Sequence, residues 1–159
     1  MEAILPRQFG QDAKELPGAR RLLANLESAS APWAIVTSGT KPLVSGWLEV
    51  MKLSTPKNLV TAEDVPNGKP HPACYALGRS RLGFTDSAEM LVLEDAPAGI
   101  RAGKAAGCKV VGLTTTHSVS QVKEAGADWV VQDLQSVVFK GISKETGKVL
   151  IEIRDAFRD

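Results

Sequence analysis

The chain has 159 residues, 43% of them hydrophobic, which fits one compact domain with a buried core. Nineteen basic and eighteen acidic residues leave a net charge of +1, which argues against nucleic acid or an anionic membrane as the main partner. No apolar stretch approaches the roughly 20 residues of a membrane span, and the first six residues are too few and too polar for a signal peptide. The two cysteines, Cys74 and Cys108, are too few for a disulfide framework. The sequence therefore predicts a cytoplasmic protein.

Short β-branched segments alternate with amphipathic helical patterns along the chain. Near-continuous apolar strands indicate burial on both faces, as in a parallel sheet. The predicted strands are 33–37, 59–62, 90–93, 109–113 and 128–131. The alternation predicts an α/β fold with a parallel sheet, flanking helices and right-handed crossovers.

Five helices are predicted around these strands. The first follows Pro17, which we place in its first turn, and carries Leu22, Leu23 and Leu26 on one face. The others are 43–51, 73–82, 98–106 and 118–125, and a glycine follows each of the last three. Beyond them, segments 137–142 and 149–153 flank a polar turn and predict either a hairpin or a loose terminal extension.

Polar residues follow the carboxyl ends of several predicted strands. Thr37 ends one strand, Glu94 and Asp95 follow another, and Lys69 lies in the loop after a third. Ligands of open parallel sheets bind at the carboxyl ends of the strands. We therefore expect these residues to meet at one rim of the sheet.

Thr37-Ser38-Gly39-Thr40 links a strand to a helix. Hydroxyl groups and unpaired N–H groups at the start of a helix favour an anion. Capping of the helix by Ser38 or Thr40 would use the same residues without a ligand. The sequence leaves both interpretations open.

Lys69 and His71 lie in a proline-rich loop. A compact ammonium on a rigid loop suits neutralisation of a phosphate, although an ordinary solvated lysine fits the pattern too. His71, between Pro70 and Pro72, is either an acid or base near neutral pH or a hydrogen-bond partner that stabilises the loop.

Glu94 and Asp95 are adjacent carboxylates at the end of an apolar strand. Such a pair is costly to bury unless it is paired or bound to metal. Mg²⁺ takes one or two carboxylates together with phosphate oxygens, so both residues are predicted metal ligands. Capping of the following helix by Asp95 is the alternative.

In their order and spacing these motifs resemble the haloacid dehalogenase superfamily. They are more closely similar to fungal-type glycerol-1-phosphatases and 2-deoxyglucose-6-phosphatases. The segments that carry the resemblance are 36–40, 61–65, 68–72, 94–103 and 125–129. The resemblance implies a Rossmann-like core and hydrolysis of phosphate monoesters through an aspartyl-phosphate.

The resemblance also implies roles for single residues. Thr37, Ser38 and Gly39 would bind the phosphoryl group, and Lys69 would neutralise its charge. Asp95, with Glu94, would hold Mg²⁺. The ligand would be a small phosphorylated or anionic molecule.

The sequence departs from the family at its start. Family members open with a strand that ends in Asp-x-Asp-Gly-Thr, which supplies the nucleophile and the general acid, and a helical cap domain follows. Neither is found here, so we expect one truncated core domain: a cap-exit remnant at 1–15, the core at 16–138 and a tail or hairpin at 139–159. In the family the missing strand lies between the strands that match 33–37 and 90–93. Its absence predicts two unpaired inner edges or a new direct pairing. Either a homodimer or an N-terminal segment that folds into the gap would then fill it.

Without the nucleophile we expect a phosphate- and Mg²⁺-binding rim but no normal phosphatase activity. Lys69, His71, Glu94 and Asp95 could instead serve acid/base chemistry in a repurposed small-molecule enzyme, in a cyclisation, elimination or isomerisation. A non-catalytic interaction module, a fragment of a sugar or polyol phosphatase, and residual hydrolysis by metal-activated water also remain open.

Overall fold

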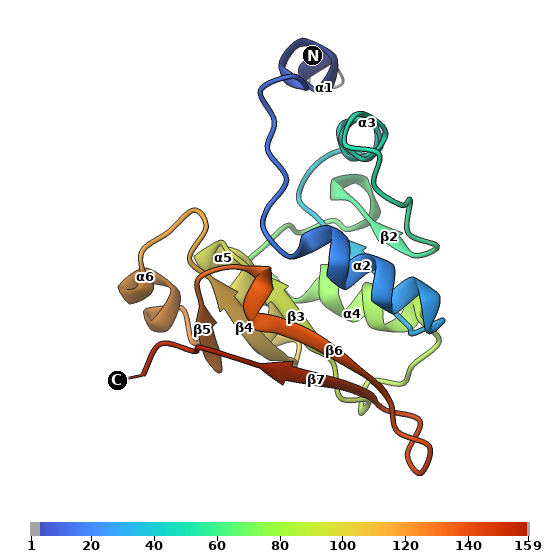
Figure 1. Cartoon of the computed structure of the whole chain (residues 1–159), viewed down its shortest axis with the longest axis vertical. Coiled ribbons are helices and arrows are strands. Elements are labelled where there is room, and N and C mark those ends of the chain that lie inside the picture. Colours follow the sequence, from blue (N-terminus) through green and yellow to red (C-terminus); the bar gives the residue numbers. More distant parts are fainter. Residues whose placement is uncertain (1–3, 159) are drawn as a thin grey trace.

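In a computed structural model, which describes residues 4–158, five parallel strands form two separate sheets (Figure 1). Strands β3 (Leu91–Glu94), β4 (Lys109–Leu113) and β5 (Trp129–Val131) make one sheet, in the order β3-β4-β5. Strands β1 (Ile35–Val36) and β2 (Leu59–Val60) make the other. The predicted α/β class and its parallel strands are confirmed.

The edge of β3 that faces away from β4 is unpaired. The N–H of Lys109 donates to the carbonyl of Met90 at 2.9 Å, and parallel strands bond through alternate residues. Val92 therefore bonds toward β4, whereas the backbone groups of Leu91 and Leu93 point to the other side. Among residues 4–158 no strand pairs with that side.

Strand β1 has an unpaired edge of the same kind. The N–H groups of Ile35 and Thr37 donate to carbonyls of Asn58 and Val60 on the β2 side, at 3.1 and 2.9 Å. The backbone groups of Val36, between them, therefore point away from β2. Of the two arrangements that the sequence left open, the structure has the unpaired inner edges.

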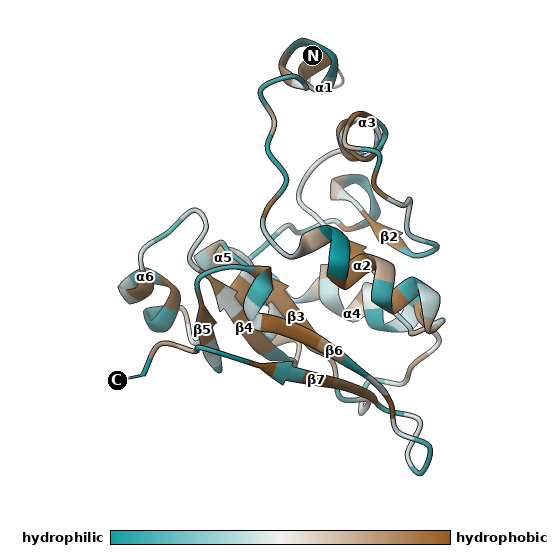
Figure 2. Ribbon diagram, viewed as in Figure 1, coloured by the Kyte–Doolittle hydropathy of each residue, from teal (hydrophilic) through white to brown (hydrophobic). Residues whose placement is uncertain are grey.

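Three helices cover one face of the strands. They are α4 (Ala73–Arg81), α5 (Pro97–Ala105) and α6 (Val119–Glu124). Their apolar side chains pack on the strands in one core cluster, whose fully buried members are Val60, Ile100, Ala102, Val110 and Val122. Figure 2 shows the matching hydrophobic colouring of β3, β4 and β5.

Helix α2 (Ala19–Ser28) and a hairpin cover the opposite face of the β3-β4-β5 sheet (Figure 1). The hairpin pairs β6 (Val137–Ile142) with β7 (Val149–Ile153) in antiparallel fashion. Leu22, Val111, Leu113, Val131 and Val137 form the buried part of this second core cluster. The hairpin interpretation of the tail is therefore confirmed, and the hairpin packs on the sheet.

The first-turn position predicted for Pro17 is wrong. Helix α2 begins at Ala19, and Gly18 is its N-cap, with a φ of 86°. A Cβ atom at Gly18 would lie 2.4 Å from the carbonyl carbon of Leu134, in the short 3₁₀ helix η3 (Leu134–Ser136). The chain needs glycine for this close approach, which moves the start of the helix two residues past the proline.

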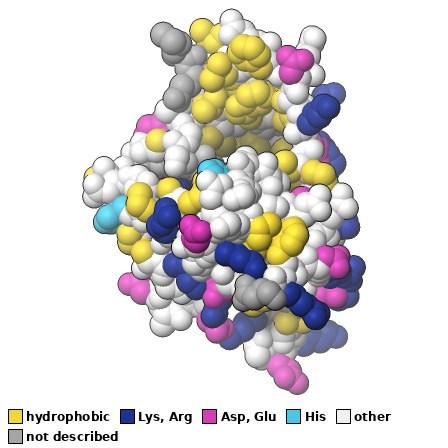
Figure 3. Space-filling model, turned by 90° about the vertical axis from the view of Figure 1, so that its left-hand side faces the viewer, with side chains coloured by type: hydrophobic (Ala, Val, Ile, Leu, Met, Phe, Trp, Pro, Cys, Tyr) yellow, Lys and Arg dark blue, Asp and Glu magenta, His cyan; other side chains and the backbone are white. Residues whose placement is uncertain are grey.

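Helices α1 (Leu5–Phe9) and α3 (Lys41–Val50) pack together at one end of the molecule (Figure 1). Their packing is close, because a Cβ atom at Gly46 would lie 2.9 Å from a ring carbon of the buried Pro6. Ile4 and Phe9 remain 51% and 52% exposed. Figure 3 shows apolar side chains gathered at this end. Within residues 4–158 no helix is both long and apolar enough to span a membrane.

Candidate functional site

A cleft of about 380 Å³ opens between the carboxyl ends of β1 and β3. Its volume is in the range of small-molecule sites. The residues that line it come from β1 and the loop after it, from the loop before α4, and from the β3–α5 connection: Val36, Thr37, Ser38, Lys69, Leu93, Glu94, Asp95, Ala96, Ala98 and Gly99. Five of the predicted site residues thus line one cleft, namely Thr37, Ser38, Lys69, Glu94 and Asp95.

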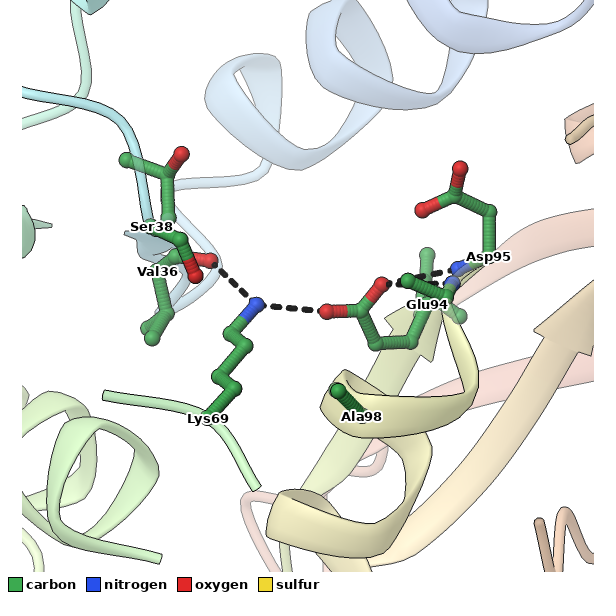
Figure 4. Close-up of a pocket in the computed structure, with 10 residues that line it drawn as sticks. Val36, Ser38, Lys69, Glu94, Asp95 and Ala98 are labelled. Atoms are coloured by element: carbon green, nitrogen blue, oxygen red, sulfur yellow. Dashed lines mark hydrogen bonds and ion pairs between the residues drawn. The ribbon is translucent and has the colours of Figure 1, made fainter. Parts of the chain in front are cut away.

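Lys69 bridges the two sheets across this cleft. Its Nζ donates to the carbonyl of Val36 at 3.2 Å and to Oε1 of Glu94 at 2.5 Å (Figure 4). The ammonium also lies 5.0 Å from the centroid of the Tyr75 ring, within the range of a cation–π contact. Its side chain is only 11% exposed. Lys69 is therefore a fixed cation between the two sheets.

Glu94 accepts hydrogen bonds through both oxygens. Oε1 accepts hydrogen bonds from Nζ of Lys69 and from the hydroxyl of Tyr75, the latter at 3.0 Å. Oε2 receives the backbone N–H groups of Asp95 and Ala96 at 2.8 and 3.2 Å. These four donors compensate the cost of burying the carboxylate. Because both oxygens are engaged by these donors, Glu94 is poorly placed to coordinate a metal ion. Its carboxylate instead orients the ammonium of Lys69.

Tyr75 and Gly99 make this arrangement possible, and neither was singled out from the sequence. Burial, and then the charge of Glu94, raise the pKa of Tyr75 far above its usual value, so its hydroxyl remains a donor. A Cβ atom at Gly99 would lie 1.8 Å from Oε1 of Glu94. Two sequence signals were available: Tyr75 is the only tyrosine in the chain, and Gly99 lies in the first turn of α5.

Asp95 lies beyond Glu94 on the same rim (Figure 4). Its Oδ2 accepts a 2.6 Å hydrogen bond from the hydroxyl of Thr116, which in turn lies 2.9 Å from Nδ1 of His117. Burial acts to raise the pKa of Asp95, but the hydrogen bonds, that of Thr116 foremost, outweigh it and hold the pKa below its usual value. Asp95 is therefore ionised at neutral pH. The alternative that Asp95 caps α5 is not observed.

The metal-binding capacity of the cleft rests on Asp95. Among residues 4–158 no group of three or more His, Cys, Asp or Glu side chains is arranged to hold a metal ion. Oδ2 of Asp95 accepts the hydrogen bond from Thr116, and Oδ1 is the second oxygen of this carboxylate. One such carboxylate oxygen suits Mg²⁺, which is commonly held by one or two carboxylates, phosphate oxygens and water. Of the two predicted metal ligands, Asp95 is therefore the one that could hold Mg²⁺.

The loop after β1 presents hydroxyl groups to the cleft. Thr37 uses its Oγ1 to accept the N–H of Gly39 at 3.0 Å, and its hydroxyl hydrogen remains available to a ligand. The start of α3 is already occupied by a carboxylate, because Glu63 accepts the N–H of Lys41 through both oxygens at 3.1 Å. Glu63 comes from the short 3₁₀ helix η2 (Ala62–Asp64). An anion in the cleft would therefore meet Thr37 and Ser38 rather than the first amides of α3.

His71 lies outside the cleft. Its Nδ1 accepts the N–H of Ala73 at 3.2 Å, at the start of α4, and its side chain is exposed. This contact matches the loop-stabilising hydrogen bond that was one of the two interpretations of His71.

Comparison with known proteins agrees with this fold. Residues 5–113 match the model of the family described as haloacid dehalogenase-like hydrolase, and the chain belongs to that family. Glycerol-1-phosphate phosphohydrolase 1 of Saccharomyces cerevisiae is 40% identical over 156 residues, which cover 94% of this chain and 62% of the yeast protein. Hexitol phosphatase A of Escherichia coli is 40% identical and is covered over 61% of its length, against 86% of this chain.

Solved structures show the same similarity. A hydrolase from Pseudomonas syringae superposes with a TM-score of 0.75 at 30% identity, over 83% of this chain and 61% of that one. A putative beta-phosphoglucomutase from Thermotoga maritima gives a TM-score of 0.70 at 32% identity, over 79% of this chain and 59% of that one. The chain thus spans about three fifths of the length of these relatives.

Proposed function

We propose that this chain is a phosphatase-like domain that binds the phosphoryl group of a small sugar or polyol phosphate in the cleft between β1 and β3. The observation that carries the proposal is the position of Lys69. Its ammonium is nearly buried, oriented by Glu94 and the Val36 carbonyl, and it lines the same cleft as the hydroxyls of Thr37 and Ser38. A fixed cation beside hydroxyl donors suits a phosphate group.

The charges of the cleft make this binding dependent on a divalent cation. Lys69 is balanced by Glu94, and the ionised Asp95 adds an excess negative charge. A phosphate dianion would be repelled by that charge. Mg²⁺ held by Asp95 would supply the positive charge that phosphate needs, as is common where Mg²⁺ joins a carboxylate to a phosphate.

We propose further that residues 1–159 alone bind phosphate esters without rapid turnover. The sequence contains no Asp-x-Asp-Gly-Thr segment. Of the two carboxylates in the cleft, Glu94 is held by four donors and Asp95 by Thr116. Neither is disposed to attack phosphorus, so a nucleophile would have to come from outside these residues. The activities named for the yeast and bacterial relatives are those of longer proteins.

Isothermal titration with inorganic phosphate and glycerol 1-phosphate tests the proposal, with and without Mg²⁺. We expect binding only with Mg²⁺, and an affinity that falls about tenfold or more in Lys69→Met, because a charge-assisted hydrogen bond is lost. The exposed Lys57→Met is the matched control and should bind as the wild type does. Failure of the wild type to bind millimolar phosphate with Mg²⁺ would exclude the proposal.

The repurposed-enzyme alternative gains no support from the site, because His71 lies outside the cleft and Glu94 is fully hydrogen-bonded. A homodimer and a cytoplasmic location remain predictions. The exposed Ile4 and Phe9, on or beside α1, support a contact surface at that end. Sedimentation equilibrium of the wild type would test the homodimer.

A further inference from the structure

We propose that Thr116 and His117 are positioning residues for Asp95. Together they fix the rotation of its carboxylate, so that one oxygen is held toward the cleft for a divalent cation. The inference rests on the proposed function, because it concerns the cation that would accompany the phosphoryl group. It brings in two residues from the loop after β4 and assigns a defined protonation pattern to the imidazole of His117.

The loop that carries Thr116 and His117 is anchored at both ends. The N–H of Thr114 donates to the carbonyl of Val131 at 3.0 Å and so extends the pairing of β4 with β5. At the other end, a capping box closes the start of α6: Oγ of Ser118 accepts the N–H of Gln121 at 3.3 Å. The loop therefore lies beside the end of β3, the neighbour of β4 in the sheet.

These anchors hold the loop without help from Asp95. The N–H of Ser118 also donates to Oε1 of Gln121, at 3.0 Å, so the capping box is complete in both directions. The hydrogen bond between Thr116 and Asp95 is thus an addition to an ordered loop. Its effect falls on the carboxylate, which lines the cleft (Figure 4).

The direction of each hydrogen bond follows from the acceptor at one end. A carboxylate only accepts, and a threonine hydroxyl has one hydrogen to donate. That hydrogen goes from Thr116 to Oδ2 of Asp95, with 2.6 Å between the two oxygens. Nδ1 of His117 lies 2.9 Å from the same hydroxyl oxygen and must therefore be the donor. The neutral imidazole of His117 is then protonated at Nδ1 and unprotonated at Nε2.

The carboxylate of Asp95 gains a fixed orientation from this arrangement. The last torsion of an aspartate side chain is broad and roughly two-fold, so the side chain alone does not set the direction of its oxygens. Because the carboxylate is planar, holding Oδ2 through Thr116 also fixes the direction of Oδ1. A hydroxyl that accepts a hydrogen bond donates more strongly, which gives His117 its part. A cation then meets a carboxylate that is already oriented, and this favours binding.

Nitrogen NMR of the neutral imidazole rings provides the first test, and it needs no cation. The other histidine of the chain, His71, is the internal control, because its Nδ1 accepts the N–H of Ala73 and so carries no proton. We expect the proton at Nδ1 in His117 and at Nε2 in His71. In Thr116→Val, which lacks the acceptor, His117 should lose its preference for Nδ1. A wild-type His117 protonated at Nε2 would overturn the proposal.

The second test measures cation affinity with Mn²⁺, which shares the preference of Mg²⁺ for oxygen ligands. Paramagnetic broadening of the Asp95 amide signal follows the titration in the absence of phosphate. Thr116→Val should weaken binding about tenfold, as is usual when a residue that orients a metal ligand is lost. Thr116→Ser keeps the hydroxyl and should bind as the wild type does, and so should the exposed Thr55→Val.

His117 is tested by a matched pair of variants. His117→Asn places an amide N–H near the position of Nδ1 and should keep most of the Mn²⁺ affinity, whereas His117→Leu has no donor and should lose more. Circular dichroism confirms that each variant is folded at the temperature of the titration. Equal affinity of His117→Asn and His117→Leu would overturn the part assigned to His117.

The outcomes separate this inference from the proposed function. Equal Mn²⁺ affinity of Thr116→Val and the wild type, or an equal loss in Thr116→Ser, would overturn the positioning role and leave phosphate binding untouched. A wild type that binds Mn²⁺ with the expected order of variants but binds no phosphate would support the positioning role and exclude the proposed function. A wild type that binds no Mn²⁺ at millimolar concentration would overturn both.

Discussion

The two edges of the β3-β4-β5 sheet differ in how the rest of the chain covers them. At the outer edge, the N–H of Phe157 donates to the carbonyl of Val130 on β5 at 2.8 Å, so the C-terminal segment covers a strand edge. At the inner edge, no described strand pairs with β3, and the side chains of Lys69 and Glu94 occupy the boundary instead. The same chain thus covers one edge with backbone and leaves the other as the wall of a cleft.

The difference shows which contacts hold the cleft open. A covered edge is secured by main-chain hydrogen bonds, whereas the open edge depends on one buried ion pair and its supporting donors. Changes at the cleft should therefore cost more stability than changes at the outer edge. Substitutions at the two edges test that ranking.

Glu94→Gln should have the largest effect. It leaves the ammonium of Lys69 nearly buried without its counter-ion, and removing one partner of a buried pair costs about 3 kcal/mol or more. Urea unfolding measures the free energy of unfolding of each variant. Glu89→Gln is the matched control, because Glu89 pairs with Lys148 on the exposed surface. The free energy of unfolding of this variant should not differ measurably from that of the wild type. Equal losses in the two variants would contradict the special role of the cleft pair.

Gly99→Ala should cause the next largest loss of stability. The added methyl group would meet Oε1 of Glu94, so either the carboxylate or the start of α5 has to move, at a cost of about 2 kcal/mol. Gly68→Ala, where a Cβ atom has no neighbour within 4 Å, serves as the control and should be nearly neutral. Thermal unfolding measures both. A stable Gly99→Ala variant with unchanged phosphate binding would show that Glu94 need not lie where it does.

Phe157→Pro tests the covered edge. Proline has no N–H to donate to Val130, so the variant should lose about 1 kcal/mol, the usual contribution of one hydrogen bond. Urea unfolding compares it directly with Glu94→Gln. A loss larger than that of Glu94→Gln would reverse the ranking of the two edges.

Acid pH should reveal the contribution of Asp95. Because its folded-state pKa is lowered, the stabilisation is complete above the unfolded pKa of about 4 and is lost as the pH falls through the lower, folded value. Thr116→Val removes the shortest hydrogen bond to Asp95. The difference in free energy of unfolding between Thr116→Val and the wild type should therefore be largest at pH 6 and smaller at pH 3. A difference that does not narrow, or one equal to that of the exposed Thr55→Val, would contradict this role.

The sequence predicted the parts of the fold that depend on local pattern. Apolar strands and helical stripes were located because their periodicity appears in the chain itself, and the rim was predicted because parallel strands bring their carboxyl ends together. Tyr75 and Gly99 were missed, since their contacts with Glu94 arise only when α4 and α5 pack beside β3. The contact between the Glu63 carboxylate and the start of α3 was missed for the same reason, because Glu63 belongs to a separate segment of the chain.

Amide hydrogen exchange of the unliganded chain tests most directly whether the cleft lies between two open edges. The N–H groups of Leu91 and Leu93 should exchange rapidly, as should that of Val36. Those of Lys109 and Asp128, which bond to neighbouring strands at 2.9 and 2.8 Å, should exchange slowly. Slow exchange in both groups would mean that the inner edges are paired, and it would contradict the open cleft.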